Sequence, residues 1–173
     1  VDNPYTPRSG MKLSMTPQLA GGILGGTVNF LKPDVEFILY VPHTRRTAFG
    51  MRAEAAMIIP YGSTDKLPLY QRFFLGGETQ IRGVPIRTVG PIEENRALGG
   101  NKFVLFNAEY YFDIGGPLRA LLFFDAGQAF LEGKKIDPKQ LRTSTGVEMR
   151  FIMPVLNVPF RLIYAFNPNR DQF

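Results

Sequence analysis

A glycine-rich loop carries the side chain with the clearest chemical role in this chain. Its motif consists of Gly76, Gly77, Ile81, Arg82 and Gly83, between two strand-like regions. Glycine adopts backbone conformations that are closed to other residues, so the loop can fold back tightly. A guanidinium keeps its charge, and its planar fork fits carboxylates. We therefore predict that the loop delivers Arg82 to a fixed acidic acceptor.

Two downstream carboxylates, Glu109 and Asp125, are the candidate acceptors. Two carboxylates could also form a pair for acid–base catalysis, as in glycosidases. A salt bridge from both groups to Arg82 is the more economical interpretation. We therefore predict no catalytic residue in this chain.

Composition excludes several other classes of function. The 173 residues suffice for one domain, contain no cysteine, and include a single histidine, His43, in a polar turn. Ser-His and Cys-His catalysis are therefore disfavoured, and no metal or cofactor is expected. The net charge of +5 comes from dispersed basic residues rather than from a stripe or basic helix, so no nucleic-acid partner is predicted.

Membrane helices are not expected either, because no run of about eighteen apolar residues occurs. No signal peptide is recognised. The chain begins at Val1 in a loop-like context. We expect it to be a piece of a longer protein.

Alternation with a period of two dominates the chain and predicts an all-β fold. The expected strands cover about 11–19, 27–41, 47–60, 101–113, 118–130, 141–153 and 159–166. Short turns alternate with longer connections, the longest at about 61–100. One end of an up-and-down sheet would then carry tight turns and the other end elaborated loops, which is the plan of an outer-membrane barrel.

Each strand has one apolar face and one face with charges near its middle. These charges include Arg52, Glu54, Glu148 and Arg150. A soluble β-sandwich would alternate in the same way. Several expected strands nevertheless span about nine residues or more, the length that crosses a bilayer, whereas soluble strands are usually about five or six residues long.

Seven strands are too few for closure, because transmembrane barrels have at least eight. An open sheet would leave unpaired backbone edges in lipid. We therefore predict an antiparallel up-and-down transmembrane β-barrel of which this chain is an incomplete segment.

The order of several motifs resembles that of BamA-like proteins in the bacterial surface antigen superfamily. This family contains outer-membrane assembly factors and two-partner secretion transporters. The resemblance covers essentially the whole chain. The motifs are Gly76-Gly77…Ile81-Arg82-Gly83, Gly99-Gly100-Asn101, Phe124-Asp125-Ala126-Gly127-Gln128 and Leu141-Arg142-Thr143-Ser144-Thr145-Gly146-Val147…Pro154. One departure is Val84, where the family motif normally continues with an aromatic residue.

The resemblance implies a sixteen-stranded barrel preceded by periplasmic polypeptide-binding repeats. Residues 1–173 would form strands nine to fifteen, and the connection at about 61–100 would be a lid loop that enters the barrel. The repeats and the closing strand, which forms the lateral seam, would lie outside this segment. Arg82 would reach an acidic inner wall at Glu109 and Asp125 and act as a conformational latch.

The function implied is folding and insertion of β-barrel proteins in the outer membrane of a Gram-negative-type bacterium. The partners would be outer-membrane lipid, unfolded outer-membrane protein clients and accessory lipoproteins. Two alternatives remain open. One is a translocation pore of a two-partner secretion system, and the other is a soluble β-sandwich binding module.

Overall fold

The computed structural model describes residues 7–22, 25, 28–62, 67–93, 96–153 and 158–168. Several sequence expectations fall elsewhere. The start of the chain at Val1, part of the glycine-rich connection at 21–26, the tight turn at 154–157 and the end at Phe173 lie outside the described residues. Within the described part, no helix is long and apolar enough to cross a membrane.

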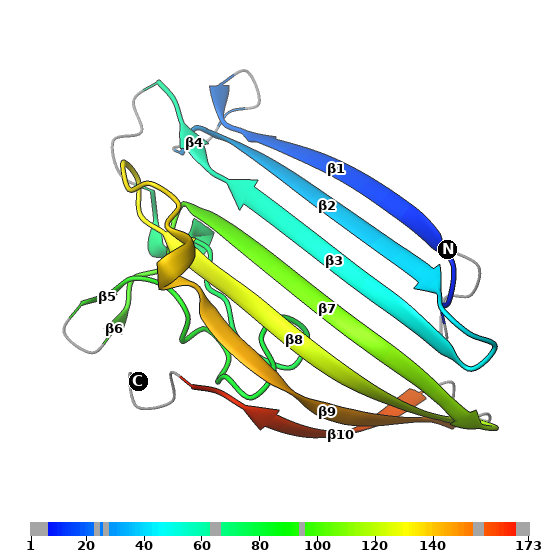
Figure 1. Cartoon of the computed structure of the whole chain (residues 1–173). Coiled ribbons are helices and arrows are strands. Elements are labelled where there is room, and N and C mark those ends of the chain that lie inside the picture. The colour runs from blue at the N-terminus through cyan, green and yellow to red at the C-terminus, as the bar shows by residue number, and fades with distance from the viewer. Residues whose placement is uncertain are drawn as a thin grey trace.

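A single curved antiparallel sheet forms most of the regular structure (Figure 1). Its strands follow one another in sequence order, so each long strand pairs with its neighbours along the chain. This meander confirms the predicted all-β, up-and-down fold. The long strands are β1 (Gly10–Ala20), β2 (Phe30–Pro42), β3 (Thr47–Met57), β7 (Lys102–Gly115), β8 (Leu118–Phe130), β9 (Arg142–Met153) and β10 (Val158–Phe166).

The predicted strand at 47–60 is divided in two. The main-chain nitrogen of Ile58 donates to Asn101 O at 2.6 Å, outside the β3 ladder. The chain then resumes as β4 (Ile59–Pro60), which pairs with β2. Alternation alone does not reveal such a break, since Ile58 and Ile59 both suit a strand.

The long connection is more ordered than its sequence indicates. It contains a short helix, η2 (Leu69–Gln71), and a small hairpin formed by β5 (Ile92–Glu93) and β6 (Arg96–Ala97). Another short helix, η3 (Pro138–Gln140), lies between β8 and β9. We call residues 61–100 the lid loop. In Figure 1 it lies against one side of the curved sheet, in green.

The two faces of the sheet differ in chemistry. On the face away from the lid loop, the outer face, large apolar side chains are exposed on all the long strands. They include Met11, Leu13, Met15, Leu19, Leu31, Val35, Val41, Phe49, Met57, Phe112, Leu122, Phe124, Val147, Met149, Phe151, Phe160, Leu162 and Phe166. A continuous exposed apolar surface marks a site of contact with a membrane or another protein. Strands of 9 to 14 residues are long enough to cross a bilayer.

The lid loop packs on the opposite, inner face through an apolar cluster. Leu75, Ile81, Val84 and Val89 from the loop lie against a wall patch of Ala56, Phe103, Leu105 and Ala129. Val84 is 4% exposed. Val84, which follows the Arg82-Gly83 dipeptide, is therefore buried in the loop–wall contact.

Gly146 on β9 leaves space for an aromatic ring from the neighbouring strand β8. A Cβ at Gly146 would fall 2.9 Å from Phe123 Cζ and 2.1 Å from Tyr164 O. Phe123 on β8 pairs in register with Gly146 and is 3% exposed. Covering a strand glycine with an aromatic ring from the next strand stabilises the pairing of the two strands.

We expect Gly146→Ala to lower the free energy of unfolding by about 1–3 kcal/mol, because the added methyl group overlaps Tyr164 O on β10 and overpacks the Phe123 contact. Urea unfolding of the intact protein in detergent, followed by circular dichroism, measures the change. The neighbouring variant Val147→Ala, on the exposed outer face, is the control. Equal unfolding midpoints for the two variants would contradict the packing argument.

Candidate functional site

Glycines shape the turn that carries Arg82. Gly76 (φ 119°) and Gly83 (φ 74°) lie in the left-handed region that favours glycine. Both are also sterically confined. A Cβ at Gly76 would lie 2.2 Å from Pro85 O, and one at Gly83 would lie 2.5 Å from the Cβ of Ala165 on β10. The turn therefore reaches the wall only with glycine at these positions.

The structure brings Arg82 against three wall carboxylates. Its Nη1 donates to Glu109 Oε1 on β7 at 2.6 Å and to Glu148 Oε2 on β9 at 2.9 Å. Its Nη2 and Nε donate to the two carboxylate oxygens of Asp125 on β8, at 2.6 and 2.8 Å. Arg82 is only 3% exposed. Three adjacent strands thus converge on one guanidinium.

Asp125 fixes the loop backbone as well as the side chain. Its Oδ2 accepts from the main-chain nitrogen of Arg82 at 3.0 Å, and its Oδ1 accepts from Asn107 Nδ2 at 2.8 Å. With no exposed surface, Asp125 depends on these donors for its solvation. On the other side, the guanidinium carbon of Arg82 lies 3.9 Å from the Phe123 ring centroid, a cation–π contact.

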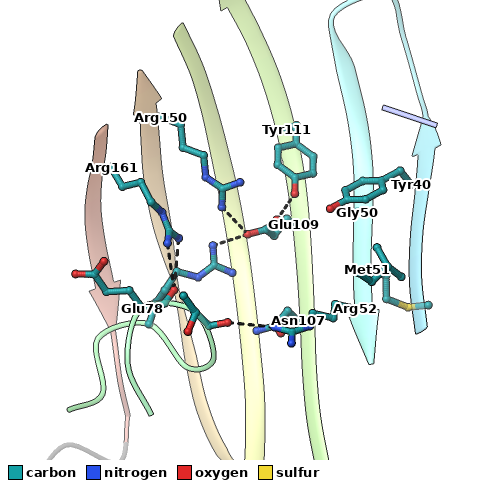
Figure 2. Close-up of a pocket in the computed structure, with 13 residues that line it drawn as sticks. Tyr40, Gly50, Met51, Arg52, Glu78, Asn107, Glu109, Tyr111, Arg150 and Arg161 are labelled. Carbon is teal, nitrogen blue, oxygen red and sulfur yellow. Dashed lines mark hydrogen bonds and ion pairs between the residues drawn. The ribbon is translucent and has the colours of Figure 1, made fainter. Parts of the chain in front are cut away.

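A second set of charges surrounds the first. Arg150 Nη2 donates to Glu109 Oε1 at 3.0 Å, and Arg161 Nε donates to Glu148 Oε1 at 2.5 Å. The Tyr111 hydroxyl donates to the other oxygen of Glu109. Figure 2 shows Arg150 and Tyr111 directed towards Glu109, while Arg161 extends alongside from the neighbouring strand β10.

The cluster is electrically balanced. Three guanidinium groups, from Arg82, Arg150 and Arg161, face three carboxylates, from Glu109, Asp125 and Glu148. Burial by itself disfavours the charged form of Arg82. The hydrogen bond to Asp125 and the charge of Glu109 outweigh this effect and raise the pKa of the loop arginine above its ordinary value. The Arg82 charge is therefore permanent.

Two of the charges predicted for the wall belong to a different group. Arg52 on β3 donates to Glu36 Oε1 at 2.8 Å and to Glu54 Oε2 at 2.5 Å. Lys12 on β1 extends this ladder to Glu36 at 3.5 Å. The remaining Arg52 nitrogen, Nη1, reaches the lid loop at Thr79 O, 3.3 Å away. Arg52 and Glu54 thus lie beside the Arg82 cluster.

A cavity of about 360 Å³ separates the two groups on the inner face. Gly50 makes room for it, because a Cβ there would lie 2.8 Å from both the Tyr40 and the Tyr111 rings. The lining residues are Ile38, Tyr40, Gly50, Met51, Arg52, Glu78, Thr79, Arg82, Asn107, Glu109, Tyr111, Arg150 and Arg161. Among the described residues, no group of histidine, cysteine and acidic side chains could hold a metal ion. The exposed His43 hydrogen-bonds the Tyr110 hydroxyl, 2.5 Å from its Nδ1.

The sequence understated some members of the Arg82 cluster. Glu148 appeared only as one of several wall charges, yet it contacts Arg82 directly. Asn107 and Arg161 were not among the predicted site residues. Alternation places residues on a face, whereas cross-strand register decides which of them meet, and the register is not legible from alternation.

A one-sheet meander with an apolar outer face and an inward loop anchored by a buried arginine defines the wall of an up-and-down β-barrel. Comparison with known proteins agrees: the model of the Omp85 superfamily domain matches residues 1–172. The chain therefore belongs to the Omp85 superfamily.

Individual relatives give the same picture. The chain is 28% identical over 178 residues to "Outer membrane protein assembly factor BamA" of Nitratidesulfovibrio vulgaris, covering 99% of this chain and 22% of that protein. It is 35% identical over 97 residues to the human "Sorting and assembly machinery component 50 homolog", covering 56% of this chain and 20% of that protein. The chain thus spans about a fifth of the length of these relatives.

A solved structure supports the fold. The crystal structure of BamA from Haemophilus ducreyi lacking POTRA domains 1-3 aligns with a TM-score of 0.82 and 19% sequence identity. The alignment covers 96% of this chain and 36% of that chain. This match confirms the fold that alternation and connection lengths predicted, a segment of an antiparallel β-barrel.

We expect Arg82→Ala to lower the free energy of unfolding by about 3–5 kcal/mol, because it leaves buried carboxylates without their shared cation. Thermal unfolding of the intact protein in detergent measures the effect.

Lys12→Ala is the matched control, since it also removes a cation from a carboxylate on the inner face. The Lys12 side chain is 57% exposed. We expect its removal to cost about 0–1 kcal/mol. Losses of similar size in the two variants would show that the Arg82 cluster gains nothing from burial.

Proposed function

We propose that the protein carrying this chain folds and inserts β-barrel proteins into the outer membrane of a Gram-negative-type bacterium. The observation that carries the proposal is the match of nearly the whole chain to a bacterial protein named as an outer membrane protein assembly factor. Relatives named as sorting and assembly machinery components match 56% of the chain. Residues 1–173 would be the C-terminal part of the barrel, with periplasmic repeats and the closing strand elsewhere in the protein.

The partners follow from this role. The apolar outer face would contact outer-membrane lipid, since its exposed side chains are large and uncharged. Unfolded outer-membrane proteins would be the clients, and accessory lipoproteins would assist. The site contains no nucleophile with an adjacent base, so a role in bond chemistry has no support among the described residues.

Arg82 would serve as a latch that holds the lid loop against the wall. Its support is the burial of the guanidinium and its contacts with Glu109, Asp125 and Glu148 from three strands. Such a latch keeps the loop inside the barrel and stiffens the wall while the seam elsewhere in the protein engages a client. Client recognition at the seam would use β-augmentation, in which an edge strand templates a new one.

Two other functions make different predictions. A two-partner secretion pore would use the same barrel wall to pass one polypeptide through its lumen. A soluble β-sandwich needs two sheets packed face to face, and in the described part of the chain the large sheet packs against a loop rather than a second large sheet. The assembly role and the pore are therefore the two alternatives to be tested.

We expect depletion of the intact protein in its own cells to lower the folded, heat-modifiable forms of many outer-membrane proteins. Complementation with Arg82→Glu would fail to restore them, because a carboxylate would then face Glu109, Asp125 and Glu148. The control is Arg45→Glu, the same charge reversal in the exposed turn between β2 and β3. Loss of one secreted protein, with barrel proteins intact, would instead establish a dedicated export pore. Full complementation by Arg82→Glu would refute the latch.

A further inference from the structure

We propose that three wall side chains, Arg52, Asn107 and Arg161, position the lid loop by holding the main-chain carbonyls of its turn. This contact is made to the main chain of the turn and not to the Arg82 side chain, although Asp125 and Glu148 take part in both. The inference deepens the latch, and it rests on the proposed function only for the biological use of a seated loop. The three donors are positioning residues, because they act through the loop.

The turn offers three consecutive carbonyls to three different strands. Asn107 Nδ2 on β7 donates to Gln80 O at 2.7 Å. Arg52 Nη1 on β3 donates to Thr79 O at 3.3 Å. Arg161 on β10 completes the set, with Nη1 and Nη2 each 3.4 Å from Glu78 O.

Each donor is itself held in place by a carboxylate. Glu36 and Glu54 hold Arg52, Asp125 holds Asn107, and Glu148 holds Arg161. These wall pairs fix the donors before the loop arrives, so seating the loop costs little further side-chain entropy. Donors that are oriented in advance bind carbonyls more strongly than freely moving side chains do.

The turn itself presents its backbone to the wall. Gln80 N donates to Gly77 O at 3.2 Å, which closes the turn internally. The side chains of Glu78 and Thr79 are exposed, whereas Ile81 and Arg82 just beyond are buried. A loop main chain packed on a wall must find partners for its carbonyls. The wall donors are these partners, and their hydrogen bonds do not depend on which side chains the turn carries.

The geometry separates two kinds of residue that sequence alone would not distinguish. Replacement of a turn side chain, such as Glu78 or Thr79, leaves the carbonyl in place. Replacement of a donor removes a hydrogen bond even though the loop sequence is unchanged. The contacts also reach from β3 to β10 across the curvature of the wall, further than the three strands β7, β8 and β9 that hold the Arg82 side chain.

The test measures where the loop lies, in the purified intact protein with its cysteines removed. Spin labels are attached through cysteines at Ile86 in the loop and Leu162 on β10, which are 75% and 73% exposed. Pulsed electron–electron double resonance gives the distribution of distances between the two spin labels. No client is present, so the result is independent of whether the protein is an assembly factor or a pore.

The donor variants are Arg52→Lys, Asn107→Leu and Arg161→Lys. Leucine removes the amide donor at similar size, and lysine keeps the charge but lacks the planar fork that serves a carboxylate and a carbonyl at the same time. We expect each to widen the distance distribution roughly twofold as the loop samples more positions. Glu78→Ala and Thr79→Ala, in the turn, are the matched controls and should retain the wild-type width. Lys12→Ala, in the same charge ladder as Arg52 but away from the loop, should do the same.

Two results would overturn the proposal. One is a wild-type width in all donor variants while Arg82→Ala widens the distribution, which would assign the whole grip to Arg82. The other is an equal widening of the distance distribution by the turn variants, which would mean that the wall holds the loop through the side chains of the turn. Folding of each variant is verified by heat-modifiable migration. Should Asn107→Leu not fold, Asn107→Gln replaces it, since its longer chain displaces the amide from Gln80 O.

Discussion

Burial of a permanently charged guanidinium is the constraint around which the inner face is organised. Arg82 has almost no contact with solvent, and an unpaired buried charge is prohibitively costly. The wall must therefore supply carboxylates wherever the loop places this group. Glu109, Asp125 and Glu148 meet that requirement from three adjacent strands. Their mutual repulsion would in turn disfavour the empty wall, so loop and wall stabilise one another.

Sheet register makes this convergence possible. Side chains two residues apart share a face, and antiparallel pairing sets which of them are neighbours across strands. In this sheet Glu109 pairs with Phe123, and Phe123 pairs with Gly146. The Phe123 ring therefore packs beside Gly146, and the Arg82 guanidinium lies over the ring. A slip of one residue in any one of these strands would turn its carboxylate to the outer face.

The sequence predicted the strands, their faces and the pairing candidates of Arg82, because alternation and glycine-bounded turns are local signals. It did not predict the break at Ile58, which depends on a hydrogen bond to Asn101 beyond the lid loop. The direct contact of Glu148 with Arg82 was also missed, because it depends on cross-strand register and on the position along the strands at which the loop meets the wall. The role of the turn carbonyls could not be predicted from the sequence, because every residue has a main-chain carbonyl whatever its type.

The stacking of Phe123 between Gly146 and Arg82 has a spectroscopic consequence. The ring packs against Gly146, and the Arg82 guanidinium of the loop lies 3.9 Å from the ring centroid. A seated loop would therefore slow the rotation of this ring about its axis. The chemical shift of a fluorine atom on Phe123 would depend on both contacts. Its resonance would therefore give the populations of molecules with a seated and an unseated loop, without any label on the loop itself.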